Sequence, residues 1–208
     1  MIESFAQMDF ALQGWDGVDH LRAATFRGED AIAEHVRAHP EPDGMATTLT
    51  AVLLYRDLLV LLHAGDSRGY PLRGGKLYQL SKDDTFVQSL IDPGAISRAE
   101  ARSHPQRNVV VRALTGRGTR FSIASWEARL GDRLLLCSDG LSDVLMDDEI
   151  TEVMKSPGDS DRCAQNLVDH ALNCGARDNV SCIVADVVEL SAHHAPVFAG
   201  AAMSRARD

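Results

Sequence analysis

Three apolar runs in this sequence each lie next to an aspartate. In each case a small or turn-forming residue stands beside that aspartate. They are Leu61-Leu62-His63-Ala64-Gly65-Asp66, Leu134-Leu135-Leu136-Cys137-Ser138-Asp139-Gly140, and Arg177-Asp178-Asn179 directly before the last apolar run. Taken singly, such an aspartate most often belongs to a plain turn or loop. In combination, aspartates at strand ends are held by a rigid sheet and face a cleft. Because Mg²⁺ and Mn²⁺ prefer oxygen ligands, the pattern predicts a site for hard divalent cations.

The periodicity of the chain predicts an α+β fold. Apolar residues spaced by three and four between Leu21 and Val36 predict a helix that ends before Pro40. Gly74-Gly75 indicates a hairpin turn. Strand-type runs occupy residues 47–55, 58–64, 69–73, 76–80, 109–114, 121–128, 133–137 and 180–190. Hairpins with helices grouped before and after them indicate a layered α+β domain and not a parallel βαβ sheet.

Further helices are predicted from capping signals. Short helices are expected within residues 81–101, where Ser97 is a candidate N-cap and Glu100 completes a capping box. Asp147 and Ser160 are candidate N-caps of two longer helices that end at residues 154 and 172. We interpret residues 1–190 as one domain and the small, polar, aperiodic residues 191–208 as a flexible C-terminal tail.

The charge, the cysteine spacing and the apolar runs limit which partners and which cell compartment are expected for this chain. The net charge of −9 gives no electrostatic support for nucleic-acid binding, and an acidic protein that acts on phosphate needs bound cations. No glycine-rich phosphate loop follows a strand, which counts against nucleotide-dependent chemistry. The four cysteines form no CxxC pair, no signal peptide is visible, and no apolar run is long enough to cross a bilayer. We therefore expect a cytoplasmic protein with reduced thiols.

The ordered motifs of this chain resemble those of bacterial PP2C-type (PPM) metal-dependent protein serine/threonine phosphatases. The resemblance covers about residues 28–189 and rests on Gly44-Met45-Ala46-Thr47-Thr48-Leu49, Gly65-Asp66-Ser67-Arg68, His104-Pro105-Gln106-Arg107-Asn108, Gly131-Asp132-Arg133 running on to Ser138-Asp139-Gly140-Leu141, and Arg177-Asp178-Asn179-Val180. It implies an α-β-β-α sandwich of two antiparallel sheets flanked by helices. It also implies a two-metal centre at one end of the sandwich.

The same resemblance assigns roles to the aspartates. It implies that Asp139 and Asp178 are catalytic ligands of a binuclear Mn²⁺ or Mg²⁺ centre. Asp66 would hold a third, weaker ion together with Asp139, and Asp143 would reach that ion through water. Residues 81–107 would form a flap beside the site. The implied reaction is hydrolysis of phosphoserine and phosphothreonine by a metal-activated water. The implied substrates are proteins that bacterial serine/threonine kinases have phosphorylated.

One part of the family pattern is not found in this sequence. The family opens with a strand that bears a phosphate-binding arginine, followed by an Asp-Gly-rich motif whose aspartate bridges both metals. Asp16-Gly17 lacks a preceding β run and is interpreted as a helix-entry turn. Two explanations stay open: an N-terminally incomplete version of a longer enzyme, which the intact later motifs favour, or a catalytically silent domain that binds phosphoproteins or acts as a regulatory module. A hydrolase of small phosphate esters would share the same site.

Other polar residues have simpler interpretations. His63 lies inside an apolar strand and is expected to be a core histidine. Arg68 is expected to anchor the hairpin. Asp84 stands where relatives often carry histidine, and the acidic run Asp147-Asp148-Glu149 is explained by the favourable interaction of negative charge with a helix N-terminus.

Overall fold

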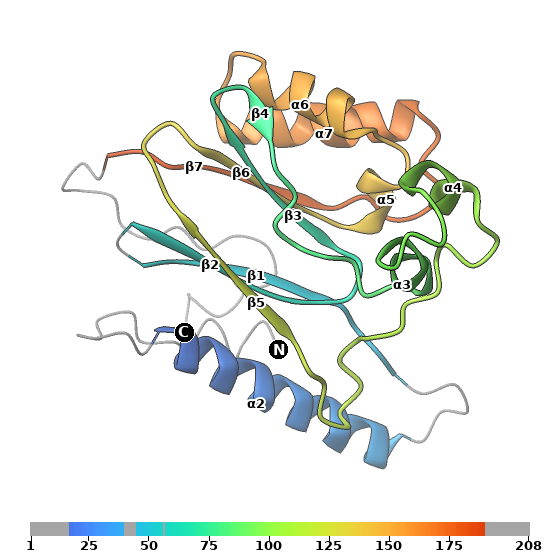
Figure 1. Ribbon diagram of the computed structural model, residues 1–208. Coiled ribbons are helices and arrows are strands. Elements are labelled where there is room, and N and C mark those ends of the chain that lie inside the picture. Colours follow the sequence, from blue (N-terminus) through green and yellow to red (C-terminus); the bar gives the residue numbers. More distant parts are fainter. Residues whose placement is uncertain (1–16, 40–44, 56, 190–208) are drawn as a thin grey trace. The chain divides into compact units, whose positions relative to one another are not determined.

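The computed structural model describes residues 17–39, 45–55 and 57–189 of the chain (Figure 1). Two compact units are distinguished. Among the described residues, the first unit contains residues 17–39, 45–47, 114–119 and 189, and the second contains residues 48–55, 57–113 and 120–188. The expected C-terminal tail at residues 191–208 and Asp16 lie outside the described residues.

The first unit is built on helix α2 (Gly17–Ala38). The predicted helix is confirmed, and it ends before Pro40 as expected. Its buried positions follow the helical period: Leu21, Ala24, Thr25, Gly28, Glu29 and Ile32. The loop at Gly116 passes very close to this helix, since a Cβ at that position would lie 2.5 Å from the Ala33 backbone nitrogen. Gly116 also has a φ of 75°, which only glycine adopts without strain.

The second unit contains two antiparallel sheets. One sheet has the order β1-β2-β5, with β1 (Leu49–Tyr55), β2 (Leu58–Ala64) and β5 (Ser122–Glu127). The other has the order β4-β3-β6-β7, with β4 (Lys76–Leu77), β3 (Arg68–Arg73), β6 (Arg133–Cys137) and β7 (Cys182–Asp186). Every pairing of neighbouring strands is antiparallel. The predicted pair of antiparallel sheets with flanking helices is confirmed.

Helices α6 (Asp147–Lys155) and α7 (Ser160–Asn173) lie against one face of the four-stranded sheet (Figure 1). The hydrophobic core of the second unit forms between them and the inward-facing residues of β3 and β6. Fully buried leucines dominate this core, and each stabilises the fold by about 1.5–3 kcal/mol relative to an exposed position. Its largest apolar members are Tyr70, Leu135, Leu141, Leu145, Ile150, Met154 and Leu167.

Shorter helices occupy one end of the sheets. Helices α3 (Phe86–Ile91) and α4 (Arg98–Ser103) form the segment expected as a flap, and the capping box of Ser97 with Glu100 is confirmed. Among the described residues, no helix combines the length and apolar character that a membrane crossing requires.

Several expected element boundaries were wrong. Residues 109–114 form no strand; only single bridges, Thr85 with Val110 and Thr47 with Leu114, involve them. The last strand ends at Asp186 and does not reach residue 190. The N-caps of α6 and α7 are Met146 and Asp159, one residue earlier than expected. The β-propensity of a run such as residues 109–114 forms a ladder only where a neighbouring strand is available, which the sequence does not show.

Candidate metal centre

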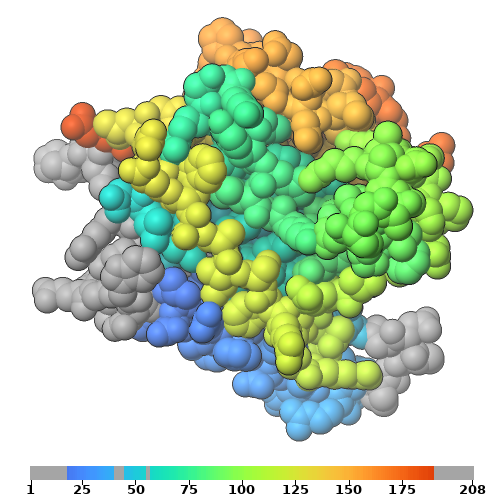
Figure 2. All heavy atoms as spheres, viewed as in Figure 1, coloured from blue at the N-terminus to red at the C-terminus, as the bar shows by residue number. Residues whose placement is uncertain are grey.

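Several aspartates line one cavity of about 410 Å³ in the second unit. The cavity lies where the turn after β2, the flap helices α3 and α4, helix α5 (Asp139–Ser142) and the first turn of α6 meet. In Figure 2 the light-green surface around residue 100 lies next to the orange surface around residue 150. The acidic lining residues are Asp66, Asp83, Asp139, Asp143, Asp147 and Asp148. Carboxylates from three separate stretches of the chain, at residues 66, 83 and 139–148, therefore share one space.

The turn that carries Asp66 is held by close backbone packing. Gly65 has a φ of 118°, and a Cβ there would lie 2.4 Å from the Thr48 side chain. The Gly65 N–H donates to Asp84 Oδ2 at 3.1 Å, and the Asp84 N–H donates to the Gly65 carbonyl oxygen at 2.7 Å. Asp84 thus fixes the Gly65-Asp66 turn. These contacts direct Asp66 to the cavity at the end of a buried strand.

Asp139 opens helix α5, a short helix that the sequence analysis missed because four residues carry no periodic signal. Asp139 Oδ1 accepts a hydrogen bond from the Gly140 N–H at 2.9 Å. A Cβ on Gly140 would lie 2.4 Å from the Asn179 carbonyl oxygen, so only glycine allows this approach. Ser138 Oγ donates to the same carbonyl at 3.2 Å and accepts from the Ser181 N–H at 3.1 Å. The segment before Asp139 is therefore locked to the segment after Asp178.

Three of the four predicted metal ligands line the cavity, and the backbone of the fourth lies beside helix α5, which carries Asp139. Asp66, Asp139 and Asp143 line it, whereas Asp178 does not. The Asp178 carboxylate instead accepts a hydrogen bond from the Asn179 N–H at 2.7 Å. Its backbone lies against Gly140, since the Asp178 carbonyl oxygen is 3.5 Å from the position of a Cβ there.

The electrostatics of the cavity favour a bound cation. Burial, and next the charge of Asp139, raise the pKa of Asp66 to about 6. Desolvation and then Asp139 also raise the pKa of Asp143. Both shifts mean that ionising these carboxylates in the folded state costs free energy, first because they are partly removed from water and next because Asp139 is nearby. A divalent cation removes this cost, and carboxylate oxygens are the donors that Mg²⁺ and Mn²⁺ prefer, so the residues present fit such an ion.

Arginines also reach this cavity, which the sequence analysis did not anticipate. Arg98, Arg102 and Arg107 line it. Arg102 donates to the carbonyl oxygens of Ser142, Asp143 and Leu145 at 3.3–3.4 Å and so ties helix α4 to the end of α5. The signal that could have revealed them is the four-residue spacing of Arg98 and Arg102, which places both on one face of a helix.

Arg68, at the start of hairpin strand β3, also lines the cavity. Its guanidinium binds both carboxylate oxygens of Asp83, with Nη2 at 2.6 Å from Oδ2 and Nε at 2.9 Å from Oδ1, and it donates to the Tyr70 hydroxyl at 3.2 Å. It therefore anchors β3 to the entry of the flap. His63, in contrast, is a buried histidine as expected: its Nδ1 lies 2.9 Å from the Thr50 hydroxyl, and burial lowers its pKa.

Comparison with known proteins identifies the family. The sequence profile described as protein phosphatase 2C matches residues 16–173. The chain belongs to the protein phosphatase 2C family. Among its relatives is the serine/threonine protein phosphatase PstP of Mycobacterium tuberculosis, which is 47% identical over 202 residues. That match covers 97% of this chain but only 39% of PstP, so the chain spans about two-fifths of the length of this relative.

Solved structures of the family share the fold. A crystal structure of the Mycobacterium tuberculosis phosphatase PstP/Ppp has a TM-score of 0.85 at 47% identity, covering 90% of this chain and 80% of that one. The catalytic domain of PstP, solved in complex with two manganese ions, has a TM-score of 0.82 at 46% identity, covering 90% and 79%. The sandwich of two antiparallel sheets is thus the family fold.

Proposed function

We propose that this chain hydrolyses phosphoserine and phosphothreonine in proteins in a reaction that depends on Mn²⁺ or Mg²⁺. The observation that carries the proposal is the convergence of Asp66, Asp139 and Asp143 on one cavity that arginines also line, in a chain of this family. We further propose that its substrates are cytoplasmic phosphoproteins produced by bacterial serine/threonine kinases. The names of the serine/threonine phosphatases among its relatives support the proposed activity on phosphoserine and phosphothreonine.

Within this proposal the aspartates hold the ions. Asp139 and Asp178 are assigned to a binuclear centre, and the two manganese ions in the PstP catalytic domain support the number of ions. Asp66 and Asp143 are assigned to a third, weaker ion beside Asp139. When bound, these ions activate a water molecule for attack on phosphorus and neutralise the phosphoryl oxygens.

The remaining side chains of the cavity bind and orient the substrate. A phosphate dianion approaching Asp66 and Asp139 is repelled by their charges. The guanidinium groups of Arg98 and Arg107 offset this repulsion and can donate charge-assisted hydrogen bonds to phosphate oxygens. Arg102 has a different task, because its hydrogen bonds to the α5 carbonyls hold the helix that bears Asp139 against the flap.

The decisive experiment measures phosphate release from a phosphothreonine peptide in the presence of Mn²⁺. Wild-type chain is compared with Asp139→Asn, which keeps the shape of the side chain but removes a charged ligand. Asp169→Asn, at an exposed position on α7, is the matched control. We expect release by wild type and by the control, and a loss of at least about 100-fold in Asp139→Asn, as removal of a main catalytic element produces.

The alternatives give different results in the same assay. A folded wild-type chain that binds the phosphopeptide without releasing phosphate would refute catalysis by this chain and favour the silent, phosphoprotein-binding domain. Efficient hydrolysis of p-nitrophenyl phosphate together with poor activity on the peptide would favour a small phosphate ester as the substrate. Activity that is equal in Asp139→Asn and wild type would show that this aspartate is not a catalytic ligand.

A further inference from the structure

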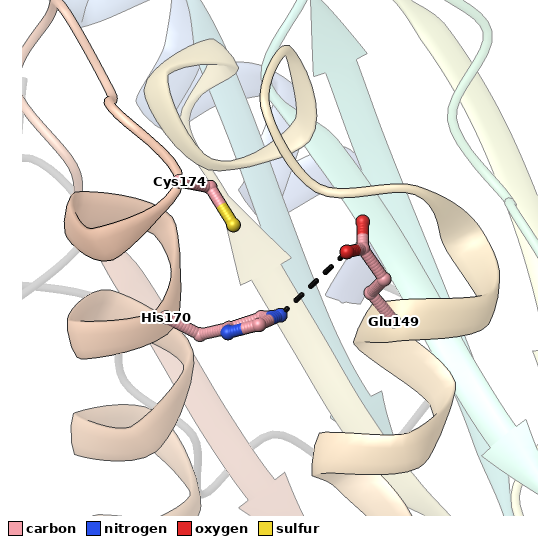
Figure 3. Close-up of side chains that lie close together, drawn as sticks. All are labelled: Glu149, His170 and Cys174. Carbon is pink, nitrogen blue, oxygen red and sulfur yellow. Dashed lines mark ion pairs between the residues drawn. The ribbon is translucent and has the colours of Figure 1, made fainter.

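A second group of side chains of the kinds that bind metals lies on helices α6 and α7, outside the lining of the aspartate cavity. Glu149 comes from the first turn of α6, and His170 and Cys174 come from the last turn of α7 and its C-cap (Figure 3). The three ligand atoms all lie within 4.8 Å of one another. None of the three residues lines the cavity that contains Asp66 and Asp139.

The sequence spacing and the helix pairing create this cluster. His170 and Cys174 are four residues apart, so they lie one above the other on one side of α7. Helices α6 and α7 pack side by side, which brings Glu149 to the same side. Its Oε1 lies 3.8 Å from His170 Nε2, a long ion pair when the imidazole is protonated. An ion pair explains why Glu149 and His170 lie close together, but it does not explain why the Cys174 thiol lies beside them.

We propose that Glu149, His170 and Cys174 form a site for a borderline-soft divalent transition metal, with Zn²⁺ as the representative ion. Zinc takes imidazole nitrogen, thiolate sulfur and carboxylate oxygen at about 2.0–2.3 Å in tetrahedral geometry, which sets the ligand atoms about 3.3–3.7 Å apart. The observed 3.8 Å between Glu149 and His170 is close to this value. Because the three ligand atoms lie within 4.8 Å of one another, rotation of side chains such as the exposed Cys174 would have to close the remaining gap.

The backbone around the site holds the ligands in place. Glu149 Oε2 accepts the Met146 N–H at 2.7 Å, so this carboxylate is fixed by one oxygen while the other faces His170. Such second contacts orient a metal ligand. The Cys174 N–H donates to the His170 carbonyl oxygen at 2.9 Å. Gly175, with a φ of 83°, then ends the helix directly after the thiol.

The donor set separates this site from the aspartate cavity. Thiolate and imidazole ligands select zinc-like metals, whereas carboxylates alone suit Mg²⁺ and Mn²⁺. The side chains of His170 and Glu149 are 40% and 42% exposed, and Cys174 is exposed, so an ion reaches them directly from solvent. Three protein ligands leave the fourth tetrahedral position to water or to a further ligand.

The test uses Co²⁺ as a spectroscopic substitute for zinc in the full chain, kept reduced with a phosphine. Cobalt bound to a thiolate gives a near-ultraviolet charge-transfer band, which cobalt bound only to carboxylates does not give. We expect wild-type chain to show this band at one equivalent of Co²⁺ and to lose it on addition of Zn²⁺, which binds such sites more tightly.

Matched variants assign the band. Cys174→Ser should abolish it, and His170→Gln or Glu149→Gln should weaken Zn²⁺ binding at least about tenfold in competition with a chromophoric chelator. Cys182→Ala removes a half-buried thiol outside the cluster and should leave the band unchanged. Circular dichroism confirms that each variant is folded. The proposal is overturned if wild type shows no band, or if the band survives in folded Cys174→Ser. Unchanged Zn²⁺ affinity in His170→Gln would equally overturn it.

Discussion

The crowding of carboxylates around the cavity predicts that replacing Asp66 by asparagine stabilises the metal-free chain. Asp66 has its pKa raised from 3.8 to about 6 by burial and by the charge of Asp139. At about 1.4 kcal/mol per pH unit, a shift of this size corresponds to about 3 kcal/mol of unfavourable charging in the folded state. Solvent screening of a partly exposed carboxylate reduces that figure, so we expect a gain of about 1–2 kcal/mol. For a chain of this length the gain raises Tm by about 2–8 °C.

The pH dependence of this gain follows from the direction of the shift. Because the pKa of Asp66 is higher in the folded state than its ordinary value of 3.8, the folded state binds the proton more tightly. The penalty of the ionised carboxylate is therefore fully present above about pH 6 and disappears as the pH falls from about 6 to about 4. The stability gain of Asp66→Asn over wild type should therefore disappear over the same pH range.

The assay is thermal unfolding followed by circular dichroism, in EDTA at about pH 7.5 and again at about pH 4.5. Asp169→Asn, at an exposed position where the same chemical change is made, is the control. Added Mn²⁺ should reverse the order, because wild type gains stability from the ion that Asp66→Asn binds less well. If Asp66→Asn in EDTA is no more stable than wild type at the higher pH, burial and the charge of Asp139 do not make ionised Asp66 unfavourable as the structure indicates.

Three further predictions concern the contacts that shape the site. Gly140→Ala places a Cβ 2.4 Å from the Asn179 carbonyl oxygen and should lower the free energy of unfolding by about 1–3 kcal/mol in urea titrations; unchanged stability would show that the two segments can separate freely. Arg102→Met removes the hydrogen bonds from α4 to the α5 carbonyls, so proteolysis within residues 81–107 should become faster while Lys82→Met, at an exposed ion pair, has no such effect. Hydrogen bonds from Arg73 lower the pKa of the buried Asp132. The ionised Asp132 therefore stabilises the fold above the ordinary pKa of aspartate, and this stabilisation is lost as the pH falls through the lowered pKa. Asp132→Asn should therefore unfold at lower urea concentration than wild type at neutral pH, with the gap narrowing in acid; a constant gap would contradict this origin.

The sequence alone indicated the chemistry and most of the elements. Strands β2 and β6 have the predicted bounds, because a largely apolar run bounded by turn residues has few other ways to be buried. The aspartates after these runs were recognised for the same reason. Helix α2 and the Ser97 capping box follow from local periodicity and local hydrogen bonding, which depend only on residues that are close together in the sequence.

The tertiary structure decided which residues meet. Whether residues 109–114 form a strand depends on a partner elsewhere in the chain, and none is available to them as a ladder. The proximity of Arg102 to α5, the pairing of Arg68 with Asp83, and the cluster of Glu149, His170 and Cys174 all join elements that are separate in sequence. Local patterns report how a segment can bury its own apolar face, whereas contacts between segments depend on how the sheets and helices pack.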